Sequence, residues 1–182
     1  KKLGWQAQPT AQVNFDYCRV ADENVIGGDG NGFRIAMSGL DGGRLNIGAC
    51  SIGGAQACID HAIEYMKTRK AFGKPIADFQ ALQLRLADMA TELEAARILL
   101  YAAAQKVNDK HPLATRHAAM AKRKATDTGF SVVNDALQMF GGYGYLQDYP
   151  IERYLRDLRV HQILEGTNEI MRLIVSRDML RQ

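Results

Sequence analysis

The sequence predicts a mainly α protein, in which an antiparallel helical bundle is preceded by a short β segment. Three long stretches carry apolar residues at helical spacing, and only short loops separate them. No strands alternate with these stretches, so helices are expected to pack directly against helices. The first thirty residues differ in pattern from the rest, which sets the β segment apart from the bundle.

The β segment is predicted over residues 11–20, where apolar and polar side chains alternate. Ala11, Val13 and Phe15 fall on one face of an extended chain, as the two-residue period of a strand requires. The glycine cluster at 27–32 then marks a turn. Its spacing does not fit the dinucleotide-binding fingerprint, and no βαβ pattern surrounds it.

Helices are predicted by apolar periodicity and are bounded by turn residues and caps. Asp78 and Thr167 are the expected N-caps of two of them. The glycine run 141–144 is expected to end another. The predicted helices cover residues 33–40, 44–68, 78–107, 113–140, 150–156 and 167–180, with loops at 71–77 and 109–112. In the last helix, the side chains expected to face inward are Ile170, Leu173 and Ile174.

Composition narrows the classes of function. A net charge of +3, with many charges of both signs, does not indicate nucleic-acid binding. No apolar run reaches the roughly 18 residues of a membrane span. The three cysteines form no metal or disulfide framework, which is typical of a reduced intracellular protein. Cys50 and Cys58 fall in an apolar helical pattern and are expected to act as small hydrophobic residues. The four histidines do not cluster, so no metal site is expected.

Two segments carry candidate chemistry. The segment 69–75 places three cations and a phenylalanine at a predicted helix end and the following loop. Its cations either complement the helix dipole or bind an anion, with Arg69 able to form paired hydrogen bonds. Glu165 lies just before the last helix, between apolar Leu164 and flexible Gly166. A loop glutamate is usually solvated, but in an apolar setting it can act as a general base.

Several strings together resemble the acyl-CoA dehydrogenase family. They occur in the family's order and cover nearly the whole chain. The strings are Arg69-Lys70-x-Phe72-Gly73-Lys74-Pro75, Phe79-Gln80, Gln138-x-x-Gly141-Gly142-Tyr143-Gly144-Tyr145, Tyr154-x-Arg156-Asp157 and Ile163-Leu164-Glu165-Gly166-Thr167-Asn168-Glu169-Ile170-x-Arg172. Within the family, the string His161-Gln162-Ile163-Leu164-Glu165-Gly166 is most similar to members that act on isobutyryl-CoA.

The resemblance implies a domain division and a set of site residues. Residues 1–26 are expected to end the family's middle β-domain, and residues 27–182 to form its C-terminal helical bundle, so the chain is expected to be a fragment. Glu165 is the implied catalytic base for FAD-dependent α,β-dehydrogenation of an acyl-CoA. The implied FAD contacts are Arg69, Phe72, Phe79, Gln80, Gln138, Met139, Phe140, Gly141, Gly142, Thr167, Asn168 and Glu169. The implied acyl-CoA contacts are Asp41, Gly42, Gly43, Arg44, Leu164, Gly166 and Arg177.

Two departures from the family pattern bear on the site. Some relatives carry their catalytic glutamate beside the arginine that corresponds to Arg44, where this chain has Gly43, and this strengthens Glu165 as the base. Many relatives have tyrosine immediately before the glutamate, where this chain has Leu164. Loss of the ring fits a short, branched acyl group, with isobutyryl-CoA as the expected substrate.

The resemblance also implies partners and a compartment. A homotetramer is expected, with the contacts of Arg69 and residues 138–142 reaching a flavin held mainly by a neighbouring subunit. Electron-transfer flavoprotein is the expected electron acceptor. The implied location is the cytoplasm for a bacterial protein and the mitochondrial matrix for a eukaryotic one. Two other functions stay open: an acyl-CoA oxidase on the same scaffold, and a non-enzymatic helical module for oligomerisation.

Overall fold

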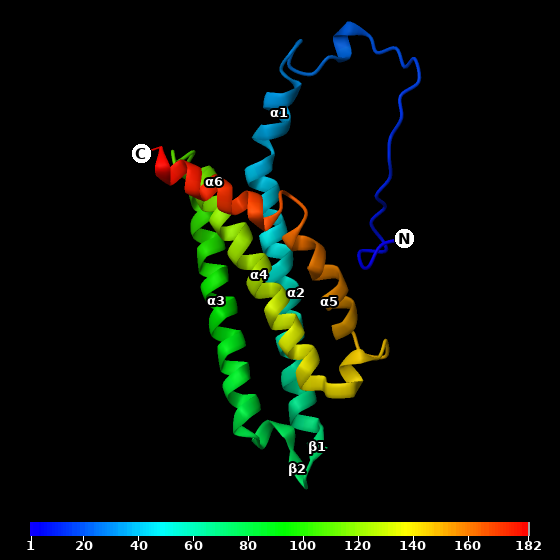
Figure 1. Cartoon of the computed structure of the whole chain (residues 1–182), viewed down its shortest axis with the longest axis vertical. Helices are drawn as coiled ribbons and strands as arrows, with labels where there is room; N and C mark the ends of the chain where they lie inside the picture. Colours follow the sequence, from blue (N-terminus) through cyan, green and yellow to red (C-terminus); the bar gives the residue numbers. More distant parts are fainter. Residues whose placement is uncertain (182) are drawn as a thin grey trace.

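The bundle consists of three long antiparallel helices, as the sequence predicts. A computed structural model of the chain describes residues 1–181. It contains α2 (Leu40–Thr68), α3 (Gln80–Asn108) and α4 (Ala114–Phe140), which run side by side along the long axis of the molecule (Figure 1). The central helix is α4, which packs against α2 and α3 and also against the shorter helices that follow it. The predicted mainly α class is confirmed.

Small residues let α2 and α4 approach closely. Alanines such as Ala55, Ala121 and Ala125 are fully buried, so the two backbones meet with little side-chain volume between them. Gly129 of α4 lies so close to α2 that an added Cβ would be 3.0 Å from the carbonyl oxygen of Ser51. Larger side chains, including Leu93 of α3, fill the rest of the core. The glycine and alanine content of these helices therefore sets the spacing of the bundle.

The connection between α2 and α3 is more ordered than a simple loop. Residues Lys70–Ala71 (β1) and Lys74–Pro75 (β2) form an antiparallel pair, followed by the 3-10 turn η2 (Ile76–Asp78). Asp78 was predicted to be the N-cap of α3, and this prediction is wrong. Phe79 occupies the N-cap position and makes no side-chain capping bond. Asp78 is instead the last residue of η2, so α3 starts later than expected.

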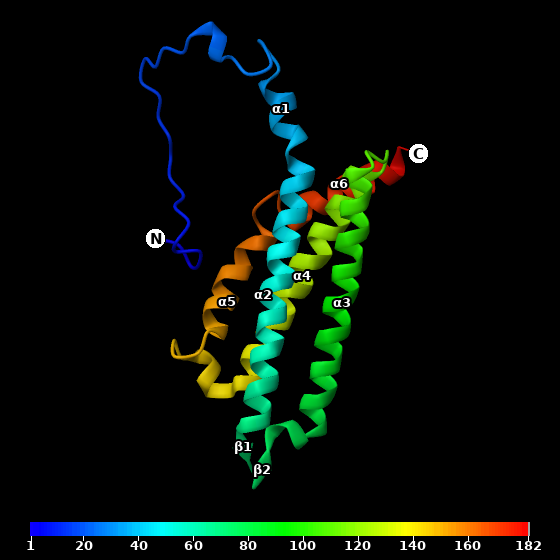
Figure 2. The ribbon, with the colours of Figure 1, turned by 180° about the vertical axis from the view of Figure 1, so that it is seen from behind.

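The first 31 residues form no strand. The chain leaves the side of the bundle and arches to α1 (Gly32–Ser38), with only the 3-10 turn η1 (Asp22–Asn24) on the way (Figures 1 and 2). The strand predicted over 11–20 is therefore absent from the structure. Alternating side chains stabilise a strand only where a neighbouring strand pairs with its backbone, and the described residues supply none beside this segment.

The shorter helices place the loop that contains Glu165. After α4 come η3 (Gly141–Tyr145), α5 (Ile151–Arg159), η4 (Val160–Gln162) and α6 (Asn168–Leu180). Gly141 ends α4 with a φ of 58°, a conformation that suits glycine, as expected from the glycine run. Thr167 caps α6, because its hydroxyl oxygen accepts a hydrogen bond from the backbone N–H of Ile170 at 3.4 Å. Both expected helix boundaries are confirmed.

The inward face of α6 differs from the prediction. Met171 is fully buried, whereas Ile170 and Leu173 are nearly half exposed. Because α6 lies across the end of the bundle and packs mainly on α4, only a narrow face of it is covered. Ile174 is partly buried.

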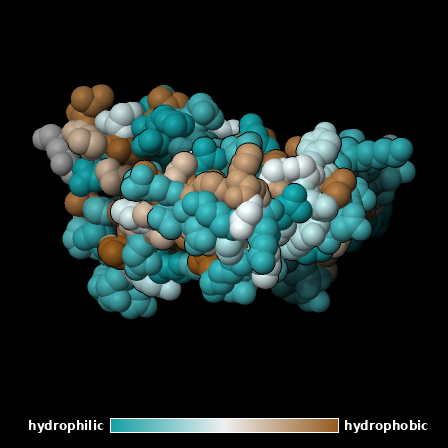
Figure 3. Space-filling view, turned by 90° about the horizontal axis from the view of Figure 1, so that it is seen from below, coloured by the Kyte–Doolittle hydropathy of each residue, from teal (hydrophilic) through white to brown (hydrophobic). Residues whose placement is uncertain are grey.

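Two cysteines of α2 differ in burial, Cys58 being buried and Cys50 exposed. Burial raises the pKa of the Cys58 thiol to about 12, which keeps it protonated and consistent with a small hydrophobic role. Cys50 is exposed, contrary to expectation, because none of the helices in residues 1–181 covers its side of α2. From the β1–β2 end the surface is mostly hydrophilic, with scattered apolar patches (Figure 3). Among residues 1–181, no helix has the length and apolar content needed to cross a bilayer.

Candidate functional site

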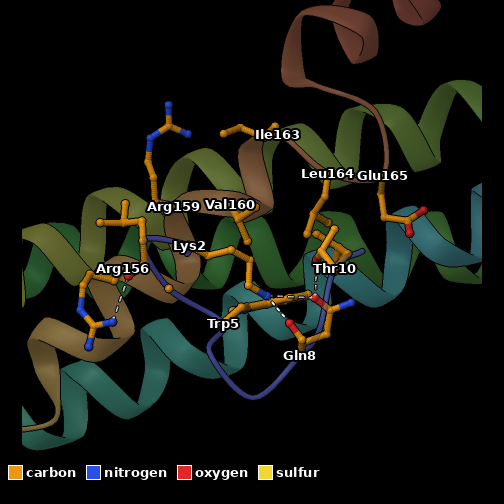
Figure 4. A pocket seen from close by; sticks show the side chains of 13 residues that line it. Lys2, Trp5, Gln8, Thr10, Arg156, Arg159, Val160, Ile163, Leu164 and Glu165 are labelled. Atoms are coloured by element: carbon orange, nitrogen blue, oxygen red, sulfur yellow. Dashed lines mark hydrogen bonds between the residues drawn. The ribbon is translucent and has the colours of Figure 1, made fainter. Parts of the chain in front are cut away.

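The loop between η4 and α6 holds Glu165 in an uncommon backbone conformation. Glu165 has a φ of 55° and Gly166 a φ of 85°. A positive φ is easy for glycine but costs free energy for a residue with a Cβ. Such strain usually persists where surrounding contacts fix the backbone, and it is frequent at functional sites. The two residues turn the chain sharply just before the Thr167 cap, which projects the Glu165 side chain toward α2 (Figure 4).

The Glu165 carboxylate lies directly against the start of α2. A Cβ built on Gly43 would come within 2.4 Å of the Glu165 Oε2 atom, so only glycine leaves room for this carboxylate. The adjacent Arg44 is buried, and its guanidinium donates a hydrogen bond of 2.7 Å to Asp41. Asp41 also accepts a hydrogen bond of 2.6 Å from the Thr115 hydroxyl, which ties the start of α2 to α4.

A cavity of about 640 Å³ opens beside the Glu165 side chain. Its helical wall combines η4 and the Glu165 loop with α2, and residues of the N-terminal segment close the other side (Figure 4). The lining from the helical part is Ile47, Arg156, Arg159, Val160, Ile163, Leu164 and Glu165. The structure thus places an ionisable carboxylate at one end of a mainly apolar space, as a base acting on a carbon acid requires.

Behind this loop lies a buried lysine that sequence reasoning did not single out. Lys122 of α4 is fully buried, and its ammonium donates hydrogen bonds to the Gly166 carbonyl at 2.8 Å and to the Asn168 side-chain oxygen at 2.9 Å. The Asn168 amide in turn donates to Asp127 at 2.7 Å and to Thr126 at 3.0 Å. The signal was present in the sequence, because Lys122 interrupts the apolar stripe of its helix.

His161, on η4, is also buried. Its Nδ1 atom shares a hydrogen bond of 2.7 Å with the Ser51 hydroxyl, and the Trp5 ring packs edge-on against it at 5.3 Å. The backbone N–H of Trp5 donates to Asp157 at 2.6 Å, which fastens the N-terminal segment to α5. Burial, reinforced by the nearby Lys122 charge, lowers the pKa of His161 from 6.5 to about 4. The imidazole is therefore neutral at pH 7 and contributes packing and one hydrogen bond.

His161 is expected to make stability depend on pH between about 4 and 6.5. In this window the unfolded histidine binds a proton and the folded one does not, so the free energy of unfolding falls as pH falls. Each unit of pKa difference is worth about 1.4 kcal/mol, so the full loss is about 3 kcal/mol. Urea unfolding at a series of pH values measures this loss.

A non-titrating variant isolates the histidine from the carboxylates that also titrate at acid pH. His161→Gln retains a group that can bond Ser51, and it is expected to flatten the pH dependence by most of this amount. His111→Gln, at an exposed histidine far from Ser51 and Trp5, is the matched substitution that controls for the loss of one imidazole. Equal slopes for wild type and His161→Gln would show that folding does not lower the pKa of His161.

A second group of predicted site residues lies at the other end of the bundle. It surrounds a cavity of about 600 Å³ where α2 ends and α4 meets η3. The Arg69 guanidinium lies 5.2 Å from the centre of the Tyr143 ring, and Tyr65 stacks on Phe140 at 4.2 Å. The predicted FAD contacts that line this cavity are Arg69, Gln138, Met139, Phe140, Gly141 and Gly142. Open space borders both glycines, so their backbone is accessible to a ligand.

The two groups do not meet within one chain. Gly43 and Arg69 lie at opposite ends of α2, which at 1.5 Å per residue separates them by roughly 40 Å. Near the Arg69 end, Phe79 is partly buried and contacts exposed Phe72 at 6.1 Å between ring centres, and Gln80 is exposed at the start of α3.

At the Glu165 end, the predicted contacts fall into three places. Thr167, Asn168 and Glu169 line a small cavity of about 170 Å³ at the start of α6. Asp41, Gly42, Gly43 and Arg44 form the first turns of α2. Arg177 is exposed near the end of α6 and does not line the Glu165 cavity. Within residues 1–181, no group of three or more metal-ligating side chains is present.

Comparison with known proteins identifies the class. The model of the acyl-CoA dehydrogenase C-terminal domain matches residues 30–180. The chain therefore belongs to the acyl-CoA dehydrogenase family, and the resemblance drawn from its motif strings is confirmed.

Particular relatives agree with this assignment. Mitochondrial isobutyryl-CoA dehydrogenase of Dictyostelium discoideum is 56% identical over 179 residues, which are 98% of this chain and 43% of that protein. Its Bos taurus counterpart is 51% identical over 182 residues, or 100% of this chain and 44% of the relative. A solved structure described as electron transferring flavoprotein of Acidaminococcus fermentans contains a chain that matches with a TM-score of 0.96 and 48% identity, covering 100% of this chain and 48% of that one. The chain thus spans less than half the length of these relatives.

Proposed function

We propose that this chain supplies the catalytic base and part of the cofactor site of an FAD-dependent acyl-CoA dehydrogenase. The reaction converts a short, branched acyl-CoA to its 2-enoyl-CoA. The observation that carries the proposal is the Glu165 carboxylate, which lies against Gly43 at the end of an acyl-sized apolar cavity. Membership of the family, and the isobutyryl-CoA dehydrogenases among its relatives, support the reaction class.

In this proposal Glu165 removes a proton from the carbon next to the thioester carbonyl. Such a proton is a weak acid, so the base must lie close to it and correctly aligned. The strained loop and the contact with Gly43 hold the carboxylate in one place. Apolar neighbours such as Leu164 and Ile47 exclude water from the reacting carbon.

Negative charge develops on the thioester oxygen as the proton leaves. In this proposal, backbone N–H groups beside Glu165 donate hydrogen bonds to that oxygen. Donors that are already oriented stabilise such charge without reorganising during the reaction. The left-handed backbone at Glu165 and Gly166 would orient these N–H groups toward the thioester oxygen.

The residues of both ends fit an extended flavin dinucleotide shared between subunits. At the Glu165 end the contacts would come from Thr167, Asn168 and Glu169 at the start of α6. At the other end they would come from Arg69, from the stacked aromatic rings and from the open backbone of Gly141 and Gly142. When bound, FAD accepts the hydride from the β-carbon. The roughly 40 Å between the two ends favours contacts with two different flavins in an oligomer.

The remaining proposals follow from the family. Residues 1–26 would complete a middle β-domain, whose other strands would pair with the segment that lacks a partner in this structure. We also propose a homotetramer and electron transfer to an electron-transfer flavoprotein. The mitochondrial relatives and the bacterial ones suggest the mitochondrial matrix or the bacterial cytoplasm, according to the source.

The acyl preference is tested by comparing substrates on the full-length enzyme. Leu164 lines the cavity and replaces a tyrosine, so a short branched chain should fit better than a long one. We expect isobutyryl-CoA to have the highest kcat/KM, with butyryl-CoA lower by about 10-fold, because discrimination on the scale of one methylene is worth about 1–3 kcal/mol. A preference for octanoyl-CoA would rule out this substrate class. Reduction of electron-transfer flavoprotein, without matching oxygen consumption, separates the dehydrogenase from an oxidase.

A further inference from the structure

The side chain of Lys122 connects the core of the bundle to the Glu165 loop. An ammonium with no exposed surface is costly to bury unless its hydrogen bonds are satisfied. Here it donates to the Gly166 carbonyl and to Asn168, which both lie within three residues of Glu165 in the chain. The fully buried lysine thus holds the loop against α4, because it bonds to Gly166 just before α6 and to Asn168, the first residue of α6.

The bond to the Gly166 carbonyl acts on the backbone itself. It fixes the peptide unit that joins Gly166 to Thr167, immediately after the two residues with positive φ. Glu165 in a left-handed conformation is strained, so the loop needs external contacts to keep it there. On one side the Thr167 cap holds the start of α6. On the other side, Lys122 anchors the turn to α4.

The charges around Lys122 come from four elements. Asp127 lies on its own helix, Glu165 on the loop, and Glu169 on α6, and all three attract the ammonium. Arg44 on α2 repels it, and His161 on η4 faces it as a neutral ring. Burial lowers the pKa of Lys122 from 10.5 to about 8, so the group remains mostly charged at pH 7.

We propose that Lys122 is a positioning residue for the catalytic base: its hydrogen bond to the Gly166 carbonyl holds the Glu165 loop in the geometry that proton abstraction needs. The inference rests on the function proposed for Glu165. Lys122 does not contact the reacting atoms, and it acts through the backbone of the loop. A misplacement of about 1 Å in a catalytic group can lower the rate by about 100-fold.

The test compares Lys122→Met and Lys122→Gln in the flavin-loaded enzyme that contains this chain. Methionine has a similar length without charge or donor, whereas glutamine has no charge but keeps an N–H donor. We expect the rate of flavin reduction by isobutyryl-CoA, per bound flavin, to fall about 100-fold in the methionine variant and less in the glutamine variant. The dissociation constant for the substrate should change by less than about threefold, since the cavity wall is unchanged.

Hydrogen exchange supplies a measurement that needs no activity. In Lys122→Met, backbone amides in residues 160–171 should exchange faster than in the wild type, while those of α3 keep their protection. The matched control is Lys124→Met, which removes a partly exposed lysine two residues away that pairs with Glu92. Lys124→Met should change neither the rate of flavin reduction nor the amide exchange of residues 160–171. If methionine prevents folding, the glutamine variant carries both measurements.

The outcomes separate the two proposals. Wild-type flavin reduction and wild-type exchange in a folded Lys122→Met, or in Lys122→Gln if only that variant folds, would overturn the positioning role alone when Glu165→Gln is inactive. A lower melting temperature with an unchanged rate per flavin would also overturn it, because that result describes a packing role only. An active Glu165→Gln would overturn both proposals.

Discussion

Replacing Glu165 by glutamine is expected to lower the rate of flavin reduction by about 10⁴-fold, the upper range for loss of a general base. Glutamine keeps the shape of the side chain beside Gly43 but cannot accept the α-proton. Binding of flavin and of acyl-CoA should stay near wild type, because the volume of the side chain at position 165 is nearly unchanged. Rapid mixing of the flavin-loaded protein with isobutyryl-CoA, followed by visible absorbance, measures the rate.

An exposed glutamate on the opposite side of the bundle provides the control. Glu94 of α3 is largely solvent-accessible and pairs only with the neighbouring Arg97 in the described structure, so Glu94→Gln should reduce flavin at the wild-type rate. If Glu165→Gln also kept that rate, Glu165 would not be the base. The bundle would then be better explained as an oligomerisation module, the function that makes no use of this carboxylate.

Gly43→Ala is the second change with a large expected effect. The new methyl group would lie 2.4 Å from the Glu165 Oε2 atom, well inside van der Waals contact, so the carboxylate must move. Alanine is also a better helix former than glycine by about 1 kcal/mol. We therefore expect a protein that is at least as stable as wild type but about 100-fold slower in flavin reduction. Thermal unfolding and rapid-mixing absorbance measure the two effects separately.

The same substitution elsewhere on α2 serves as its control. Gly53 is exposed, and beyond the backbone of its own helix no described atom lies within 4 Å of the position where its Cβ would be. Gly53→Ala should therefore gain helix stability without loss of rate. A Gly43→Ala variant with a wild-type rate would mean that the carboxylate works from another position. In that case, the observed contact with Gly43 would not be part of catalysis.

Local patterns in the sequence were enough to predict the bundle. Apolar spacing over the three long helices, the Thr167 cap and the Gly141 stop all depend on neighbouring residues, and each is found in the structure. The prediction of a strand over 11–20 was wrong because alternation in the sequence does not show whether a partner strand is present, and none lies beside this segment in the described residues. The exposure of Ile170 and Leu173 has a related cause, since periodicity marks an apolar face but does not show what covers it.

The site could be predicted only in part. Motif strings identified Glu165 and Gly43 as important, but their mutual contact depends on how the last loop folds back onto α2. The backbone strain at Glu165 leaves no mark in the sequence, because glutamate is not typical of positive φ. Lys122 can be recognised in the sequence as a charged residue within an apolar stripe. Its hydrogen-bond partners cannot, because they lie more than forty residues further along the chain.

Anaerobic mixing of the flavin-loaded, full-length protein with isobutyryl-CoA, observed by visible absorbance, tests most directly whether Glu165 is the base. With Glu165 as the base, the oxidised flavin band is expected to bleach on mixing in the wild type and to persist in Glu165→Gln. Bound flavin that stays oxidised in the wild type with isobutyryl-, butyryl- and octanoyl-CoA alike would contradict the proposal that this chain carries the base of an acyl-CoA dehydrogenase.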